Sequence, residues 1–298
     1  MLNLEIQTFW KETLSQAAAI PLDAEVIPAP NQSTPWITTY AVRLTSWEGI
    51  KIRAWLSVPN LGSKTYPALL TTPGYGGDIE IHTDVVMHGF VLLTLYPRGQ
   101  GESKKEWQMA APTQLLHHPL DRNKFYYRGG YVDCLRGIEF LATRPEVDPD
   151  RIGIFGISQG GGLTLATCAL DALASTRRVK IASAHVPFLC NYLVAIRTAT
   201  TGPYEHVQKY IKENPATARQ YLDTLSYFDP ISLADSIACP VLMSAGLKDM
   251  TCPEDTIRPV FDAIKTKKSF VVYPDLVHAR SLDYRRMEMD WLTRHLTE

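Results

Sequence analysis

The chain has 298 residues, of which 45% are hydrophobic, including 14 Tyr, 9 Phe and 6 Trp; this is enough apolar material for a large core and excludes a disordered or fibrous protein. Its 30 Lys and Arg residues nearly balance 31 Asp and Glu residues, leaving a formal charge of −1 at pH 7. No basic run is long enough to follow a phosphate backbone, so neither nucleic acid nor a membrane is expected as a partner.

The amino-terminal twenty residues carry acidic side chains and no basic segment leading into an apolar core, which argues against a secretory signal. No apolar run along the chain reaches membrane-spanning length. The five cysteines are Cys134, Cys168, Cys190, Cys239 and Cys252. This odd set without a close pair favours reduced thiols over a disulfide framework, and we expect a cytoplasmic protein.

Strand patterns recur along the chain. Two alternating segments, 37–46 and 50–59, flank the turn sequence Trp-Glu-Gly and predict an antiparallel hairpin. Six further strands are expected at 66–74, 90–97, 151–156, 179–187, 239–246 and 269–275. Helical periodicity lies between them at 125–147, 157–174 and 283–296. The alternation predicts an α/β fold with a mostly parallel sheet of eight strands and helices on both faces.

The segment 188–236 departs from this alternation. After the sixth strand it replaces a single crossover with about fifty residues of helical periodicity and no strand pattern. An insertion of this length above a sheet is typical of a lid or an oligomer contact. Because no repeat, low-complexity tract or linker is present, we expect residues 1–298 to form one domain with 188–236 as a helical, lid-like insertion.

A serine stands among glycines directly after the strand at 151–156. The residues Gly-Ile-Ser-Gln-Gly from 156 to 160 fit the pattern G-x-S-x-G, with an apolar strand before them and a helix of small residues after them. In such a turn the glycines let strand and helix pass closely, and the serine hydroxyl stands clear of the sheet. Ser158 is therefore the candidate nucleophile.

A serine hydroxyl needs a base that removes its proton and an acid that orients the base. In this kind of fold the chain order is Ser, acid, His, with the acid after a late strand and the His after the last strand. Asp249 and His278 occupy those two places. Taken singly, Asp249 would be a solvated loop carboxylate and His278 a capping residue. Asp255 and Asp275 are the rival acids, but Asp255 falls deeper in the following helix and Asp275 is too near His278 along the chain to reach around its ring easily.

The intermediate of acyl transfer carries a negative oxygen that two backbone N–H groups normally stabilise. Gln159, which follows the nucleophile, offers one, and Tyr75, in the glycine-rich loop after the strand at 66–74, offers the other. The remaining histidines are His82, His88, His117, His118, His185, His206 and His295. They show no metal-binding spacing, and no dinucleotide or phosphate-binding loop occurs, so neither a metal nor a cofactor is expected.

With these residues the chain resembles the acetyl xylan esterase / cephalosporin-C deacetylase family of α/β-hydrolases. The resemblance covers nearly the whole chain. It is carried by "FWKETL", "PGYGG", the tripeptide Arg98-Gly99-Gln100 in "YPRGQGES", the block "FYYRGGYVDCLRGIEFLATRPEVDPDRIGIFGISQGGG" and "GLKDMTCP". It implies an α/β-hydrolase fold and a serine carboxylic-ester hydrolase, an acetyl esterase acting on small substrates such as xylo-oligosaccharides, other acetylated sugars or cephalosporin C.

The resemblance also implies site roles. It assigns Ser158 as nucleophile, Asp249 as orienting acid, His278 as base, and the amides of Tyr75 and Gln159 as oxyanion donors. We expect Arg98 and Gln100 to support loops below these residues, with direct substrate binding as the alternative role. The family further implies an intracellular homo-oligomer, a hexamer whose active sites face an internal chamber, and an acetyl-enzyme intermediate that needs no cofactor.

Two positions depart from the family pattern. Ala279 stands where a Glu usually follows the catalytic His, and Pro73 stands where a His often precedes the loop glycine. Two alternative functions remain open on this fold. One is a serine peptidase of the prolyl-oligopeptidase type, which usually carries a large additional domain, and the other is a non-catalytic α/β-hydrolase-like binding protein.

Overall fold

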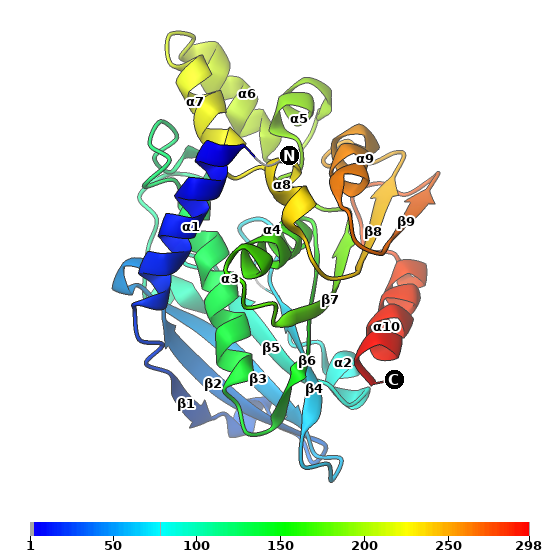
Figure 1. The fold of residues 1–298 in the computed structure, drawn as a ribbon. Helices are drawn as coiled ribbons and strands as arrows, with labels where there is room; N and C mark the ends of the chain where they lie inside the picture. Colours follow the sequence, from blue (N-terminus) through cyan, green and yellow to red (C-terminus); the bar gives the residue numbers. More distant parts are fainter. Residues whose placement is uncertain (1–2, 78, 298) are drawn as a thin grey trace.

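The computed structural model describes residues 3–77 and 79–297. Within them a nine-stranded sheet has the order β1-β2-β3-β5-β4-β6-β7-β8-β9 (Figure 1). The strands are β1 (Glu25–Pro28), β2 (Ile37–Thr45), β3 (Lys51–Pro59), β4 (Tyr66–Thr71), β5 (Val91–Tyr96), β6 (Val147–Ile157), β7 (Val179–His185), β8 (Val241–Gly246) and β9 (Lys268–Tyr273). The β1–β2, β2–β3 and β3–β5 pairs are antiparallel, and the pairs from β5 onward to β9 are parallel. The predicted α/β fold with a mostly parallel sheet is confirmed.

The sequence predicted eight strands, and the structure adds β1 at the edge of the sheet. This strand has four residues, is largely exposed and ends in Pro28, so it has neither the length nor the alternation that marks a strand in a sequence. It pairs with β2 alone, where Glu25 lies opposite Arg43 and the two side chains form an ion pair of 2.7 Å. This strand therefore forms because it pairs with β2, and its own sequence does not predict it.

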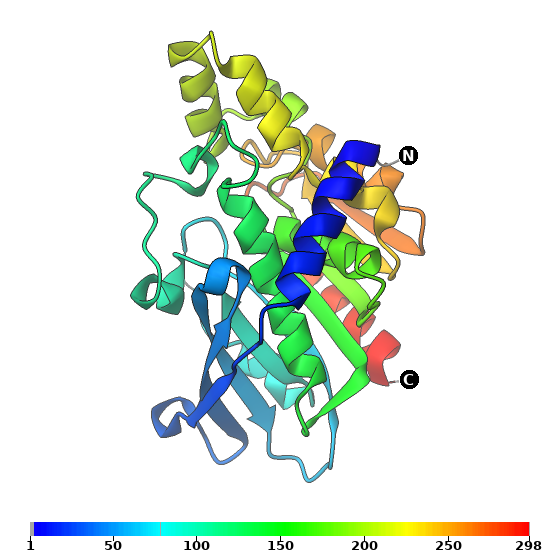
Figure 2. The same ribbon diagram turned by 60° about the vertical axis from the view of Figure 1, so that its left-hand side comes forward.

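Helices cover both faces of the sheet, as predicted. They are α1 (Leu4–Ala18), α2 (Thr83–Met87), α3 (Tyr126–Ala142), α4 (Gln159–Leu173), α5 (Tyr192–Thr198), α6 (Tyr204–Glu213), α7 (Ala218–Ser226), α8 (Pro230–Leu233), α9 (Glu254–Ala263) and α10 (Leu282–Thr297). Figures 1 and 2 show α1, α3 and α4 on one face, over the larger core, and α2 and α10 on the other. In the part of the chain that the structure describes, no helix combines the length and apolar character needed to cross a membrane.

The chain between β7 and β8 forms α5, α6, α7 and α8, where the sequence predicted a helical insertion. Figure 1 shows α5, α6 and α7 at the end of the molecule toward which β8 and β9 point. The Tyr221 hydroxyl donates to the carbonyl of Leu115 at 2.6 Å and ties α7 to the body of the protein. The Asp229 carboxylate accepts from the N–H groups of Asn191 and Tyr192 at 2.8 and 2.7 Å, although burial raises the pKa of Asp229 to about 6. The insertion is therefore packed onto the carboxyl end of the sheet.

Candidate active site

The turn between β6 and α4 holds Ser158 in an uncommon backbone conformation. Its φ is +57°, which costs energy for any residue with a side chain and is retained where the surroundings enforce it. A Cβ atom on Gly156 would lie 2.4 Å from the carbonyl carbon of Gly160, and one on Gly160 would lie 2.6 Å from the carbonyl oxygen of Thr72. Only glycine fits at these two positions, and the resulting close packing holds Ser158 at the carboxyl end of β6.

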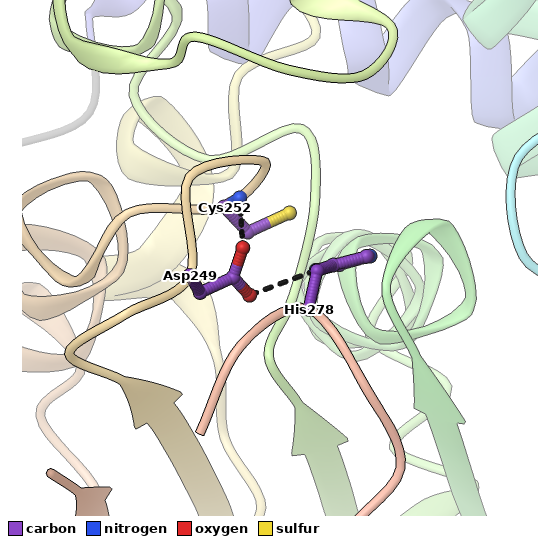
Figure 3. A group of neighbouring side chains, drawn as sticks. All are labelled: Asp249, Cys252 and His278. Atoms are coloured by element: carbon purple, nitrogen blue, oxygen red, sulfur yellow. Dashed lines mark hydrogen bonds and ion pairs between the residues drawn. The ribbon is translucent and has the colours of Figure 1, made fainter. Parts of the chain in front are cut away.

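The structure brings together the three residues predicted to act on a substrate. Nε2 of His278 lies 2.9 Å from Oγ of Ser158, and Nδ1 of His278 lies 2.8 Å from Oδ2 of Asp249. The other carboxylate oxygen of Asp249 accepts from the N–H groups of Thr251 and Cys252 at 2.9 and 2.8 Å. Figure 3 shows the contacts of Asp249 with Cys252 and His278. A buried carboxylate beside Nδ1 keeps the imidazole proton there, so the lone pair of Nε2 faces the serine hydroxyl.

The two alternative acids lie elsewhere. The Asp255 carboxylate, on α9, accepts from the Thr198 hydroxyl at 3.3 Å. Asp275 is largely exposed and forms an ion pair with Lys248 at 2.7 Å. Of the three carboxylates considered from the sequence, Asp249 is the one within hydrogen-bond distance of the His278 ring.

The two predicted oxyanion donors are joined through the side chain of Gln159. Its Nε2 donates to the carbonyl of Gly74, next to Tyr75, at 3.3 Å and to Oε1 of Gln100 at 3.1 Å, while the Tyr127 hydroxyl donates to its Oε1 at 2.9 Å. Among residues 3–77 and 79–297, neither the Tyr75 N–H nor the Gln159 N–H donates to another protein atom. An oxyanion requires N–H groups that other protein atoms do not use, and the Gln159 N–H directly follows Ser158 in the chain.

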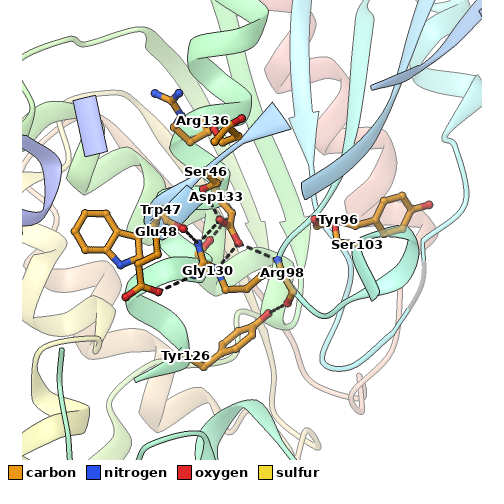
Figure 4. Close-up of polar contacts among 12 residues, drawn as sticks. Ser46, Trp47, Glu48, Tyr96, Arg98, Ser103, Tyr126, Gly130, Asp133 and Arg136 are labelled. Atoms are coloured by element: carbon orange, nitrogen blue, oxygen red, sulfur yellow. Dashed lines mark hydrogen bonds and ion pairs between the residues drawn. The ribbon is translucent and has the colours of Figure 1, made fainter. Parts of the chain in front are cut away.

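Arg98 and Gln100 are buried in a network that joins the loop after β5 to α3. Figure 4 shows the part of it around Arg98, Tyr126 and Asp133. Arg98 Nε and Nη2 donate to the two carboxylate oxygens of Asp133 at 3.0 and 2.8 Å. The Tyr126 hydroxyl donates to the Arg98 carbonyl at 2.8 Å and accepts from Nε2 of Gln100 at 3.0 Å. Because Gln100 in turn accepts from Gln159, the network reaches the loop of Tyr75 through hydrogen bonds.

Asp249, Cys252 and His278 place one potential metal-binding atom each within 4.8 Å of one another. The closeness has a simpler cause, because the Asp249 carboxylate already accepts from the His278 ring and from the Cys252 N–H. A metal would need the Cys252 thiolate. Burial, with the charge of Asp249, raises the pKa of that thiol well above its ordinary value. The donor chemistry here fits a hydrogen-bonded acid and base better than a metal site.

Sequence reasoning missed the polar groups that hold the three central residues. The N–H groups of Thr251 and Cys252 that bind Asp249 follow from a tight turn after β8, for which "KDMTCP" carries only a weak signal. His185 was grouped with the histidines that lack metal-binding spacing. Its ring contacts the segment that carries His278, and no local pattern indicates this contact.

Comparison with known proteins identifies the family. A family model described as acetyl xylan esterase (AXE1) matches residues 3–295. The chain belongs to the acetyl xylan esterase family. The resemblance found in the sequence is thereby confirmed, as is the enzyme class, an esterase of the acetyl xylan esterase type.

Similar proteins agree with this membership of the acetyl xylan esterase family. Acetyl esterase Axe7A of Xylanibacter ruminicola is 25% identical, over 98% of this chain and 67% of its own length. The solved acetyl xylan esterase from Paenibacillus sp. R4 is 27% identical with a TM-score of 0.91, and the match covers 99% of this chain and 96% of that one. Acetyl xylan esterase 1 from Thermoanaerobacterium sp. is 25% identical with a TM-score of 0.88, covering 98% and 94%. The predicted α/β-hydrolase fold is confirmed.

Proposed function

We propose that this chain is a serine esterase that removes acetyl groups from small acetylated substrates, such as xylo-oligosaccharides, other acetylated sugars or cephalosporin C. The observation that carries the proposal is the continuous chain of short contacts from Ser158 Oγ to His278 Nε2 at 2.9 Å and from His278 Nδ1 to Asp249 Oδ2 at 2.8 Å. Family membership and the name of the relative Axe7A support acetyl esters as the substrate class.

The reaction follows from these positions. Ser158 Oγ attacks the acetyl carbonyl carbon while His278 Nε2 takes the hydroxyl proton, and the N–H groups of Tyr75 and Gln159 stabilise the resulting oxyanion. His278 then gives the proton to the departing alcohol, which leaves an acetyl group on Ser158. A water molecule attacks this ester with His278 again as base, and acetate leaves. Asp249 keeps the His278 proton on Nδ1 and stabilises the imidazolium that forms in each step.

Aromatic rings connect the insertion to the Tyr75 loop. The Phe188 ring packs edge-on against the Tyr75 ring with centroids 5.5 Å apart, and the Tyr204 ring of the insertion packs on Phe188 at 4.4 Å. We propose that the insertion 188–236 acts in this way as a lid whose aromatic rings limit the length of the acyl chain. Arg98 and Gln100 support the Tyr75 loop from below. The proposal includes a cytoplasmic homo-oligomer, a hexamer by family resemblance.

Hydrolysis by purified protein tests the proposal. We expect turnover of p-nitrophenyl acetate and release of acetate from acetylated xylo-oligosaccharides, with p-nitrophenyl esters from butyrate to octanoate turned over more slowly. Ser158→Ala abolishes all three activities, whereas Ser269→Ala, which alters an exposed serine on β9, keeps them. Faster hydrolysis of a peptidyl-Pro anilide than of the acetyl ester would favour the peptidase alternative, and no turnover of any ester would favour the binding protein.

A further inference from the structure

His185 is the last residue of β7 and contacts the main chain at both Ser158 and the segment that follows His278. Its carbonyl oxygen accepts from the N–H of Ser158 at 3.0 Å. Its side chain lies against the segment that follows His278, and the residue as a whole is only 5% exposed. One residue thus contacts both chain segments that carry the reacting side chains.

Each nitrogen of the His185 ring has a partner. Nε2 lies 3.2 Å from the carbonyl oxygen of Ala279 and 3.2 Å from the N–H nitrogen of Ser281, and Nδ1 lies 2.6 Å from Oγ of Ser244. The Tyr284 ring stacks on the imidazole with centroids 4.3 Å apart and an interplanar angle of 16°. Stacking and the Ser244 contact fix the plane of the ring, so its edge points at the main chain one and three residues after His278.

The His185 ring is hydrogen-bonded at both nitrogens in either of its two neutral tautomers. With the proton on Nε2, the ring donates to the Ala279 carbonyl and Nδ1 accepts from the Ser244 hydroxyl. With the proton on Nδ1, the ring donates to Ser244 and Nε2 accepts from the Ser281 N–H. Burial lowers the pKa of His185 to about 4, so the ring is neutral near pH 7. One hydrogen bond to the segment after His278 is present in both cases.

We propose that His185 is a positioning residue that holds the main chain after His278, and through it the His278 imidazole, in line with Ser158 and Asp249. This role rests on the proposed function of His278 as the base. Residues 279–281 belong to no helix or strand and lead directly into α10 at Leu282, so their path depends on side-chain contacts of this kind. A small displacement of the His278 ring lengthens its 2.9 Å contact with Ser158 and its 2.8 Å contact with Asp249, and this lowers the rate of proton transfer.

His82 offers a matched control. It lines the same cavity of about 170 Å³ as His185, and burial lowers its pKa to about 4 as well. Its ring packs on Phe155 with centroids 5.8 Å apart. Within residues 3–77 and 79–297 its ring makes no hydrogen bond. A histidine that only fills space in this cavity should behave like His82.

The test measures kcat and KM for p-nitrophenyl acetate in the full chain and four variants. His185→Phe keeps a ring of similar size without its nitrogens, and His185→Gln places an amide donor and acceptor near the position of Nε2. Ser244→Ala removes the partner of Nδ1, and His82→Phe is the control. The thermal unfolding midpoint of each variant is measured first, and the kinetics are recorded at a temperature at which all variants are folded. Proton NMR follows the low-field signal of the His278 Nδ1–H that the Asp249 carboxylate accepts.

We expect His185→Phe to lower kcat about tenfold to a hundredfold with KM within about twofold of the parent, as displacement of a reacting group does. The low-field signal broadens in this variant and stays sharp in His82→Phe, which keeps the parental kcat. His185→Gln recovers part of the lost kcat. If His185→Phe does not fold, Ser244→Ala tests the positioning role instead. We expect its kcat to be about threefold to tenfold lower than that of the parent, which corresponds to the loss of one buried hydrogen bond.

A parental kcat in His185→Phe, or in Ser244→Ala where that variant has to decide, would overturn the role of His185. An equal loss in His82→Phe, or no recovery in His185→Gln, would overturn it too. The proposed function has its own test in Ser158→Ala. Turnover that survives in Ser158→Ala defeats the esterase mechanism, whereas parental kcat in the His185 variants beside an inactive Ser158→Ala defeats only the positioning role.

Discussion

Replacing Asp249 by Asn should reverse the tautomer of His278 while leaving the fold in place. One carboxylate oxygen of Asp249 accepts two main-chain N–H groups, those of Thr251 and Cys252, at 2.9 and 2.8 Å. The amide introduced at this position therefore keeps its oxygen on that side and turns its NH₂ group toward Nδ1 of His278. Nδ1 must then accept, the imidazole proton moves to Nε2, and Nε2 faces Ser158 Oγ with a proton where a lone pair is needed.

The size of the effect follows from this geometry. In serine hydrolases with this arrangement the wrong tautomer costs about 10⁴-fold in kcat, or about 5.4 kcal/mol of transition-state stabilisation at 1.36 kcal/mol per tenfold. The free energy of unfolding should change by no more than about 1.5 kcal/mol, because both main-chain hydrogen bonds survive. Initial rates with p-nitrophenyl acetate and urea unfolding followed by tryptophan fluorescence measure the two quantities.

Asp255→Asn is the control, since its carboxylate contacts Thr198 and not the His278 ring. It should keep the parental kcat within about twofold. If Asp249→Asn retained more than about a tenth of the parental kcat, or if Asp255→Asn lost as much, the assignment of Asp249 as the orienting acid would be wrong.

Two further predictions concern stability. Arg98→Met leaves the fully buried Asp133 carboxylate with the Ser46 hydroxyl and one main-chain N–H as donors, so the free energy of unfolding should fall by about 3–5 kcal/mol in urea unfolding, and a loss below about 1 kcal/mol would contradict the importance of this pair. The lowered pKa of His185, about 4 against 6.5 for an exposed imidazole, means that the unfolded chain binds more protons in this window, so stability falls as pH is lowered through it. Urea unfolding at a series of pH values between about 4 and 6.5 measures how the free energy of unfolding depends on pH. His185→Gln should make this dependence shallower by about 1.4 kcal/mol per pH unit than in the parent, because other groups such as Asp229 titrate in the same way in both proteins. Equal pH dependence in the two proteins would refute the lowered pKa of His185.

Much of the site could be predicted because its chemistry depends on short sequence patterns. A positive φ at Ser158 and the close approach of β6 to α4 require small residues at set distances, so the glycines at 156 and 160 mark the turn in the sequence itself. Asp249 and His278 could be placed because carboxyl ends of parallel strands meet at one edge of a sheet. The order of strand and helix along the chain then restricted which loops carry them.

The choice between acids depended on the folded chain. Asp249, Asp255 and Asp275 all follow late strands, and the sequence favoured Asp249 only by position, since Asp255 falls deeper in the following helix and Asp275 lies close to His278 along the chain. The structure turns Asp249 into the loop that faces His278 and leaves Asp275 in solvent beside Lys248. Such orientations arise from packing against distant segments, which no local periodicity encodes.

The sequence by itself determined the α/β class, the helical insertion and the serine turn, because hydrophobic periodicity and glycine placement act over a few neighbouring residues. The tertiary structure decided the strand β1, the pairing of Arg98 with Asp133, and the contact between His185 and the main chain 94 to 96 residues away. These features require two segments to meet after folding. Hydrogen bonds between buried polar groups depend on distance and angle in space, and a sequence pattern records neither.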